Sequence, residues 1–244
     1  EQICNDSKLK TNLNQTQVFN ECEHGMGHAF MFLTDSDLPK SLDYCDRQSD
    51  RQTRETCYGG AFMENSTSST NGEHPSKWIK EDDKFYPCNI LDEHQQNQCY
   101  LYQANYWLKI TTYDFVGVFK SCSELTGSYR DYCVLGIGAN LAGFSTSRSV
   151  GEAAAVCGIP AIDVGRTCIE GAIPSLLARY GGETEKIQEF CDAVSFDLKE
   201  FCFVKLGKSA EGWGRSKDDI NEICNGAGTF EQDCLGFSEL QPKF

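Results

Sequence analysis

The spacing of the cysteines is the feature of this chain that most limits its fold. The 244 residues contain 14 cysteines. From Cys45 onward, the gaps between successive cysteines are alternately short and long: 12, 31, 11, 23, 11, 24, 11, 23, 11, 22 and 10 residues. One short and one long gap together give a period of about 34 residues, which indicates a structural repeat.

Glycine follows the same period. Counted from the second cysteine of each pair, glycine recurs at the third position (Gly25, Gly60, Gly136, Gly171) and at the fifth position (Gly27, Gly138, Gly207). The repeat is degenerate, but two residue types keep a common register. We expect Gly25 and Gly27, with their counterparts Gly136 and Gly138, to let neighbouring helices approach closely.

Each repeat unit has the pattern of two helices. Residues 114–127 carry apolar side chains at helical spacing, and residues 128–143 begin a new helix with Ser128 as the predicted N-cap. Ser49 with Gln52 gives the same start signal. Strand patterns are scarce. Two helices per repeat predict an all-α fold, an α/α solenoid of about seven helix-hairpin units.

The constant short gap predicts how the cysteines pair. The first cysteine of a pair lies near the end of one helix and the second lies early in the next, so an antiparallel hairpin brings them face to face. A disulfide across a hairpin fixes its own loop length, whereas the connections between hairpins vary. We therefore predict Cys4–Cys22, Cys45–Cys57, Cys88–Cys99, Cys122–Cys133, Cys157–Cys168, Cys191–Cys202 and Cys224–Cys234. The alternative pairs each second helix with the following first helix, and leaves Cys4 and Cys234 over.

This architecture resembles tetratricopeptide-type helical repeats, and more closely the secreted bacterial cysteine-rich repeat proteins whose helix pairs are linked by disulfides. The resemblance lies in the period and the strapping over most of the chain. The Trp, Leu, Gly and Tyr positions of the tetratricopeptide consensus are not matched. The resemblance implies one elongated, curved domain over residues 1–244 that binds partners, and it implies no site residues.

Composition limits the compartment. Fourteen cysteines without a CxxC spacing are typical of disulfides formed in an oxidising compartment, and they argue against zinc–thiolate sites. Three glycosylation sequons, at Asn5, Asn14 and Asn65, agree with an extracellular location. The first residues lack the pattern of a signal peptide, so we expect the mature form of a secreted protein.

Charge and hydropathy limit the partners. The formal net charge of −14 argues against nucleic acid and against an anionic membrane surface, because both attract basic proteins. No apolar run approaches the ~18 residues of a transmembrane helix, so we expect no direct membrane insertion.

Two of the four histidines lie four residues apart in the stretch CEHGMGHAFM, residues 22–31. On a helix, His24 and His28 share one face and can reach one ion, as the histidines of HExxH zinc sites do, but the glutamate of that motif is missing. Alignment on the cysteines places Met63 of the next unit level with His28, and Glu64 follows it. Ligands from histidine and methionine suit copper, whereas histidine and glutamate suit zinc or iron. A buried structural histidine pair and a pH-responsive role are the alternatives.

The longest gap between cysteines predicts an insertion. It spans 31 residues between Cys57 and Cys88, against 22–24 for the other long gaps from Cys45 onward. We expect an inserted loop at about 65–87, which contains Trp78. Insertions in repeat proteins often lie on the binding face, and a tolerated surface loop is the alternative.

Residues 100–115 are rich in aromatic side chains. Tyr102, Tyr106 and Trp107 could stack on sugar rings or anchor a protein partner if they form an exposed row. Packing between helices is the alternative.

The sequence contains no nucleophile elbow, phosphate-binding glycine loop, dinucleotide fingerprint, haem-attachment motif or EF-hand loop. We therefore expect a secreted, non-enzymatic binding or assembly module whose helical surface recognises a protein or glycan partner. One alternative is a metal-binding protein or metalloenzyme with copper, zinc or iron at His24 and His28. The other is a structural subunit of an extracellular polymer formed by self-association. The polar terminal segments EQICNDSKLK and GFSELQPKF weigh against the polymer.

Overall fold

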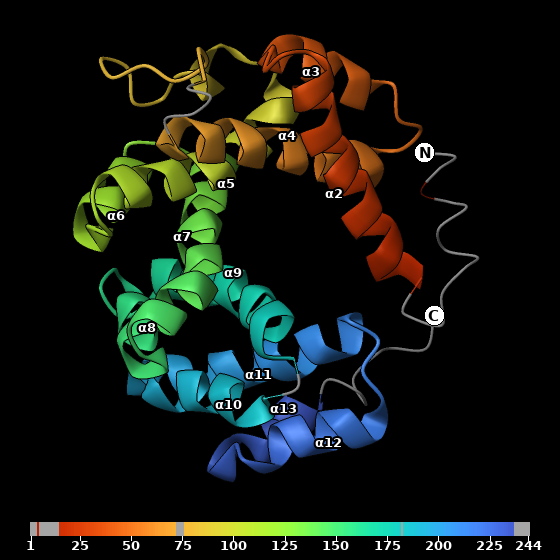
Figure 1. Ribbon diagram of the computed structural model, residues 1–244. Coiled ribbons are helices and arrows are strands. Elements are labelled where there is room, and N and C mark those ends of the chain that lie inside the picture. The colour runs from red at the N-terminus through yellow and green to blue at the C-terminus, as the bar shows by residue number, and fades with distance from the viewer. Residues whose placement is uncertain (1–3, 5–14, 72–75, 182, 237–244) are drawn as a thin grey trace. The chain divides into compact units, whose positions relative to one another are not determined.

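The structure is a computed structural model, and it describes Cys4 and residues 15–71, 76–181 and 183–236. These residues form helices joined by turns, without a strand among them. The chain divides into two compact units (Figure 1). Unit 1 comprises Glu1–Asp114 and Leu125–Cys133, and unit 2 comprises Phe115–Glu124 and Val134–Phe244.

The helices follow one another in pairs, as the repeat predicts. In chain order they are α2 (Gln15–Leu33), α3 (Leu38–Asp46), α4 (Arg51–Asn71), the 3-10 turn η1 (Cys88–Ile90), α5 (Glu93–Ile110), α6 (Phe115–Ser123), α7 (Ser128–Ser147), α8 (Val150–Val156), α9 (Ile162–Tyr180), α10 (Thr184–Ala193), α11 (Phe196–Gly212), α12 (Lys217–Asn225), the 3-10 turn η2 (Gly228–Phe230) and α13 (Glu231–Leu235).

Disulfides strap the two halves of each repeat unit, and the predicted pairing is confirmed. Six straps are Cys4–Cys22, Cys45–Cys57, Cys88–Cys99, Cys157–Cys168, Cys191–Cys202 and Cys224–Cys234. Cys122 and Cys133 are disulfide-bonded as well, and no cysteine is free. The Cα atoms within these six pairs lie 5.4–5.6 Å apart. Each strap that closes 10 to 12 residues contributes about 3 kcal/mol on the chain-entropy model.

One predicted hairpin lacks its first α-helix. Helix α4 continues to Asn71, so the first part of the insertion expected at about 65–87 is helical rather than a loop. Turns and η1 then lead into α5. Pro87 precedes η1 and has no N–H to donate, so a continuous helix through it would lose a backbone hydrogen bond. The third strap therefore joins a 3-10 turn to α5.

The second helices of successive hairpins cross at glycines. In unit 1, α4 contacts both α2 and α5. A Cβ on Gly27 would stand 2.1 Å from the carbonyl oxygen of Cys57, and a Cβ on Gly60 would stand 1.9 Å from that of His24. Only a hydrogen fits at either position. Gly25 is different, because a Cβ there would meet open space, so the prediction that it serves a close approach is wrong.

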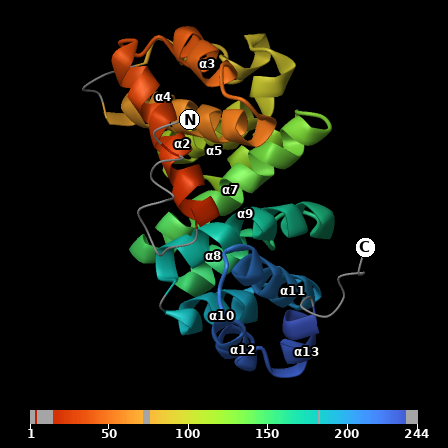
Figure 2. The same ribbon diagram turned by 90° about the vertical axis from the view of Figure 1, so that its right-hand side faces the viewer.

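Unit 2 repeats this crossing between α7 and α9. A Cβ on Gly138 would stand 2.0 Å from the carbonyl oxygen of Cys168, and one on Gly171 would stand 2.1 Å from that of Leu135. The first helices of unit 2 also pack in order, since α10 contacts both α8 and α12 (Figure 2). The glycine period thus reflects how the helices cross.

Helix α4 begins with a different cap from the predicted one. Asp50 Oδ1 accepts a hydrogen bond from the backbone N–H of Thr53 at 2.9 Å, and Oδ2 accepts one from the Thr53 hydroxyl at 2.7 Å. Ser49 therefore lies one position before the N-cap. Helix α7 begins at Ser128 itself, so this serine is the first residue of the helix, one position after the N-cap predicted from the sequence.

None of the helices that the structure describes combines the length and the apolar character needed to cross a bilayer. The polar terminal segments that we expect to cap the repeat lie almost wholly outside the described residues.

Candidate functional site

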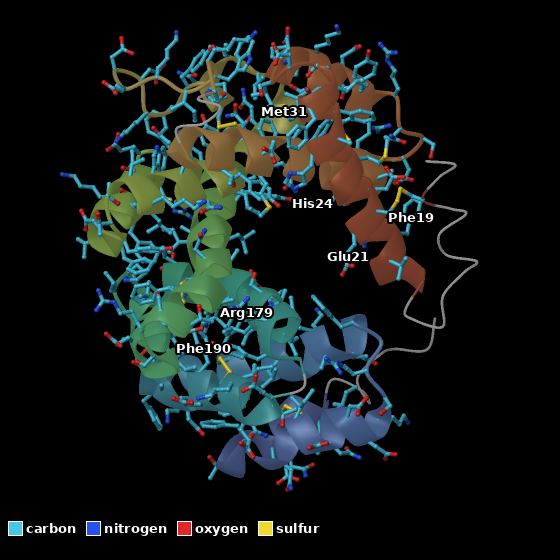
Figure 3. All side chains as sticks on the ribbon, viewed as in Figure 1. Phe19, Glu21, His24, Met31, Arg179 and Phe190 are labelled. Atoms are coloured by element: carbon cyan, nitrogen blue, oxygen red, sulfur yellow. A yellow bond between two sulfur atoms is a disulfide. The ribbon has the colours of Figure 1, made fainter. Side chains whose placement is uncertain are left out.

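His24 and His28 lie on successive turns of α2 and face each other. Their Nε2 atoms are 3.3 Å apart, and their rings meet edge to face with centroids 5.1 Å apart. Helix geometry explains the approach, because residues i and i+4 share one face. Figure 3 shows His24 about midway along α2, with Met31 closer to the α3 end. Both histidines are half-buried where α2 crosses α4.

Helix α4 holds the other edge of each ring. The Nδ1 atom of His28 lies 2.9 Å from Glu64 Oε2, so the carboxylate can accept its hydrogen. The Nδ1 atom of His24 lies beside Gly59, where a Cβ would stand 3.3 Å from it. Burial, followed by the charge of His28, lowers the pKa of His24, while the backbone of Thr56 acts in the opposite direction.

Tyr102 from α5 completes this cluster. A Cβ on Gly59 would stand 3.3 Å from both His24 Nδ1 and the Tyr102 hydroxyl, so the glycine leaves room for the two side chains. The rings of His24 and Tyr102 have centroids 6.3 Å apart. Burial raises the pKa of Tyr102 to about 12, so the phenol stays protonated at neutral pH.

The structure brings together three of the four residues proposed from the sequence for this site's neighbourhood, but in different roles. Glu64 reaches the Nδ1 edge of His28, which faces away from His24. Met63 is 37% exposed, and adjacent residues on a helix point in different directions, so Met63 and Glu64 do not present the same face. Among the described residues, no three His, Cys, Asp or Glu side chains are grouped as ligands of one ion.

A second candidate site in unit 1 is a polar pocket of about 710 Å³. Its lining contains charged side chains of both signs: Asp46, Arg51, Arg54, Glu55, Tyr58, Glu93, His94 and Asn97. No serine, threonine or cysteine is among these residues, so the pocket offers no hydroxyl or thiol nucleophile of the common kind.

Asp46, the last residue of α3, holds the pocket together. Its Oδ1 lies 3.1 Å from His94 Nε2, and its Oδ2 accepts a hydrogen bond from Gln95 Nε2 at 3.2 Å. The buried Tyr58 hydroxyl also donates to Asp46. Burial, followed by this hydrogen bond, raises the pKa of Tyr58. One carboxylate thus links α3, α4 and α5 at the pocket.

None of these pocket residues was proposed from the sequence, although one signal was present. Asp46 and Tyr58 directly follow the two cysteines of the second strap, whose Cα atoms are 5.6 Å apart. A strap therefore predicts that the residues next to its cysteines lie close together. No comparable signal places His94, which follows 48 residues after Asp46.

The proposed aromatic row is not one exposed surface. Trp107 is buried, and its indole nitrogen donates to the carbonyl oxygen of Lys84 at 3.2 Å, so its assignment as a partner-binding residue is wrong. Tyr106 is half-buried, and burial raises its pKa. Trp78 is half-buried and stacks on Tyr86, with ring centroids 6.3 Å apart. Trp107 of α5 therefore contacts the segment before η1, and Trp78 packs within that segment.

Of the three predicted glycosylation sites, the structure describes only Asn65. Asn65 is only 3% exposed, accepts a hydrogen bond from the Ser76 hydroxyl, and donates Nδ2 to the carbonyl oxygen of Trp78 at 3.5 Å. A glycan on that nitrogen would displace the last contact, so the structure argues against glycosylation at Asn65. Asn5 and Asn14 lie outside the described residues.

Comparisons with protein-family models, with curated proteins and with solved structures found no match. A proposal for the function of this protein therefore depends on the chemistry of its own sites.

Proposed function

We propose that the protein is a secreted binding module that recognises a glycan in the pocket around Asp46 and His94. The disulfides support a location outside the cytosol, because reducing compartments keep cysteines as thiols. The pocket is the observation that carries the proposal. Its volume of about 710 Å³ falls in the range of small-ligand sites.

The lining favours a polar ligand rich in hydroxyl groups. Carboxylates accept hydrogen bonds and guanidinium groups donate them. Glu93 can therefore accept from a ligand hydroxyl, and Arg51 can donate to one. Protein partners commonly dock on an apolar core with a polar rim, and no aliphatic side chain is among these lining residues. The absence of a serine, threonine or cysteine among the lining residues favours binding over acyl transfer.

A glycan array with matched variants tests this proposal. Arg51 is exposed and pairs with Glu55 in its own helix, so a double change of Arg51→Ala and Glu93→Ala alters the pocket at little cost in stability. The matched control is Lys186→Ala with Glu189→Ala, an exposed ion pair in unit 2.

We expect the wild type and the control to bind a defined subset of glycans, and the pocket variant to bind them at least about tenfold more weakly, since lost hydrogen bonds to charged groups cost about 1.5–3 kcal/mol. A wild type that binds no glycan, or a pocket variant that binds like the wild type, would overturn the proposal. Capture of a defined protein ligand at the same residues would instead favour a protein partner.

A further inference from the structure

The Nδ1 edges of His24 and His28 both face α4. His28 donates Nδ1–H to Glu64, because an ionised carboxylate only accepts. The Nδ1 edge of His24 lies beside Gly59 of α4, where a Cβ would stand 3.3 Å from that nitrogen. The His28 ring is therefore held with the proton on Nδ1, and in its neutral state the lone pair lies on Nε2.

The lone pair on His28 Nε2 thus points toward Nε2 of His24, 3.3 Å away. A neutral His24 can place its own lone pair on this nitrogen, and the two Nε2 atoms can then bind one cation together.

The distance matches a transition-metal site. Two nitrogen ligands in tetrahedral coordination, each 2.0–2.1 Å from a zinc ion, are about 3.3–3.4 Å apart. The observed separation is 3.3 Å. Histidine ligands also usually donate their other ring N–H to a carboxylate or a backbone carbonyl, which fixes the tautomer and the ring orientation. Glu64 supplies such a carboxylate for His28.

We propose that His24 and His28 bind one divalent transition-metal ion through Nε2, with Zn²⁺ as the matching ion, and that Glu64 orients the His28 ring. Glu64 is then a positioning residue and not the ligand expected from the sequence. No third His, Cys, Asp or Glu among the described residues joins the pair. The chain therefore supplies two nitrogens and leaves the other coordination positions to water or to a donor from a bound molecule.

This site is separate from the glycan pocket, so the two proposals can fail independently. Titration calorimetry with Zn²⁺ on the full disulfide-bonded chain measures the stoichiometry and affinity. His24→Ala and His28→Ala remove the ligands, and Glu64→Gln removes only the carboxylate charge. His94→Ala is the matched control, because it deletes a half-exposed histidine of the same unit outside this cluster. Circular dichroism of each variant verifies the helical fold.

We expect one Zn²⁺ per wild-type chain. Each ligand variant should lose about 100-fold or more in affinity and Glu64→Gln about tenfold, since changes around metal ligands cost 10–100-fold. His94→Ala should bind like the wild type. Absence of Zn²⁺ binding by the wild type, or unchanged binding by the His24→Ala/His28→Ala double variant, would overturn the proposal.

Imidazole ¹⁵N NMR tests the site without a variant. On addition of Zn²⁺, the Nε2 resonances of two histidines should shift while both Nδ1 atoms stay protonated. Shifts at Nδ1 instead, or at one histidine alone, would contradict the paired site.

Discussion

The backbone of Gly27 in α2 lies directly against the carbonyl oxygen of Cys57 in α4, and a Cβ on the glycine would stand 2.1 Å from that oxygen. The Cα of Gly27 and the carbonyl oxygen of Cys57 both belong to helix backbones, so neither can move without its helix. Gly25 lies two residues earlier on the same helix, and a Cβ there would meet nothing within 4 Å. The two glycines therefore form a matched pair for testing the crossing.

We expect Gly27→Ala to destabilise the protein by about 3 kcal/mol, because overpacking must push α2 away from α4. Gly25→Ala should be stabilising by about 0.5–1 kcal/mol, since alanine loses less backbone entropy in a helix. Urea unfolding with the disulfides intact measures both. Equal effects of the two substitutions would show that α2 and α4 do not cross at Gly27.

The acceptor role of Asp46 predicts an asymmetry between its partners. Asp46→Ala leaves the buried Tyr58 hydroxyl without this acceptor, which should cost about 2–3 kcal/mol. Tyr58→Phe removes the donor itself, while His94 and Gln95 still satisfy the carboxylate, so we expect a loss of about 1 kcal/mol. Urea denaturation of the two variants provides the comparison. A larger loss for Tyr58→Phe would contradict Asp46 as the shared acceptor.

The cap of α4 makes stability depend on pH in a defined direction. Hydrogen bonds from the Thr53 hydroxyl, and then from its backbone N–H, lower the pKa of Asp50. The folded state therefore binds this proton less tightly than the unfolded chain does. The contribution of the carboxylate to stability is present above about pH 4 and is lost as the pH falls through the lowered pKa.

The substitution Asp50→Asn isolates this contribution, because an asparagine side chain still caps a helix but does not titrate. We expect the wild type to have a higher Tm than Asp50→Asn at pH 7, and the difference to shrink as the pH is lowered below about 4. Thermal melts at several pH values measure it. A difference that is the same at pH 7 and pH 2 would mean that Asp50 is not the titrating cap.

The repeat was predictable because a disulfide strap fixes loop length, and loop length is visible in the sequence. The missing helix before η1 was not, since one proline among ordinary residues does not say which side of it becomes helical. Gly25 and Gly27 show a similar limit. Both share the glycine period, but only the crossing point of two helices decides which of them needs to lack a side chain.

The candidate site was predictable to the level of neighbouring residues but not of atoms. The i, i+4 spacing placed His24 beside His28, and alignment on the cysteines brought Glu64 close. Which ring nitrogen the carboxylate meets depends on side-chain rotamers, and these follow from packing at the helix crossing. The Asp46 pocket was harder, because charged residues from three different helices converge there without a shared period.

The burial of Asn65 predicts that this sequon is not glycosylated. Its side chain is 3% exposed and is bound between the Ser76 hydroxyl and the Trp78 carbonyl oxygen, so the transfer of a glycan to Nδ2 is incompatible with this packing. We expect peptide mapping by mass spectrometry, after secretion from a glycosylating host, to find Asn65 unmodified. Asn65→Ala should lower stability by about 1–2 kcal/mol, because it leaves the buried Ser76 hydroxyl without its acceptor. A glycan on Asn65 in the folded protein would mean that residues 76–78 do not pack on α4, and would restore this asparagine as a surface position.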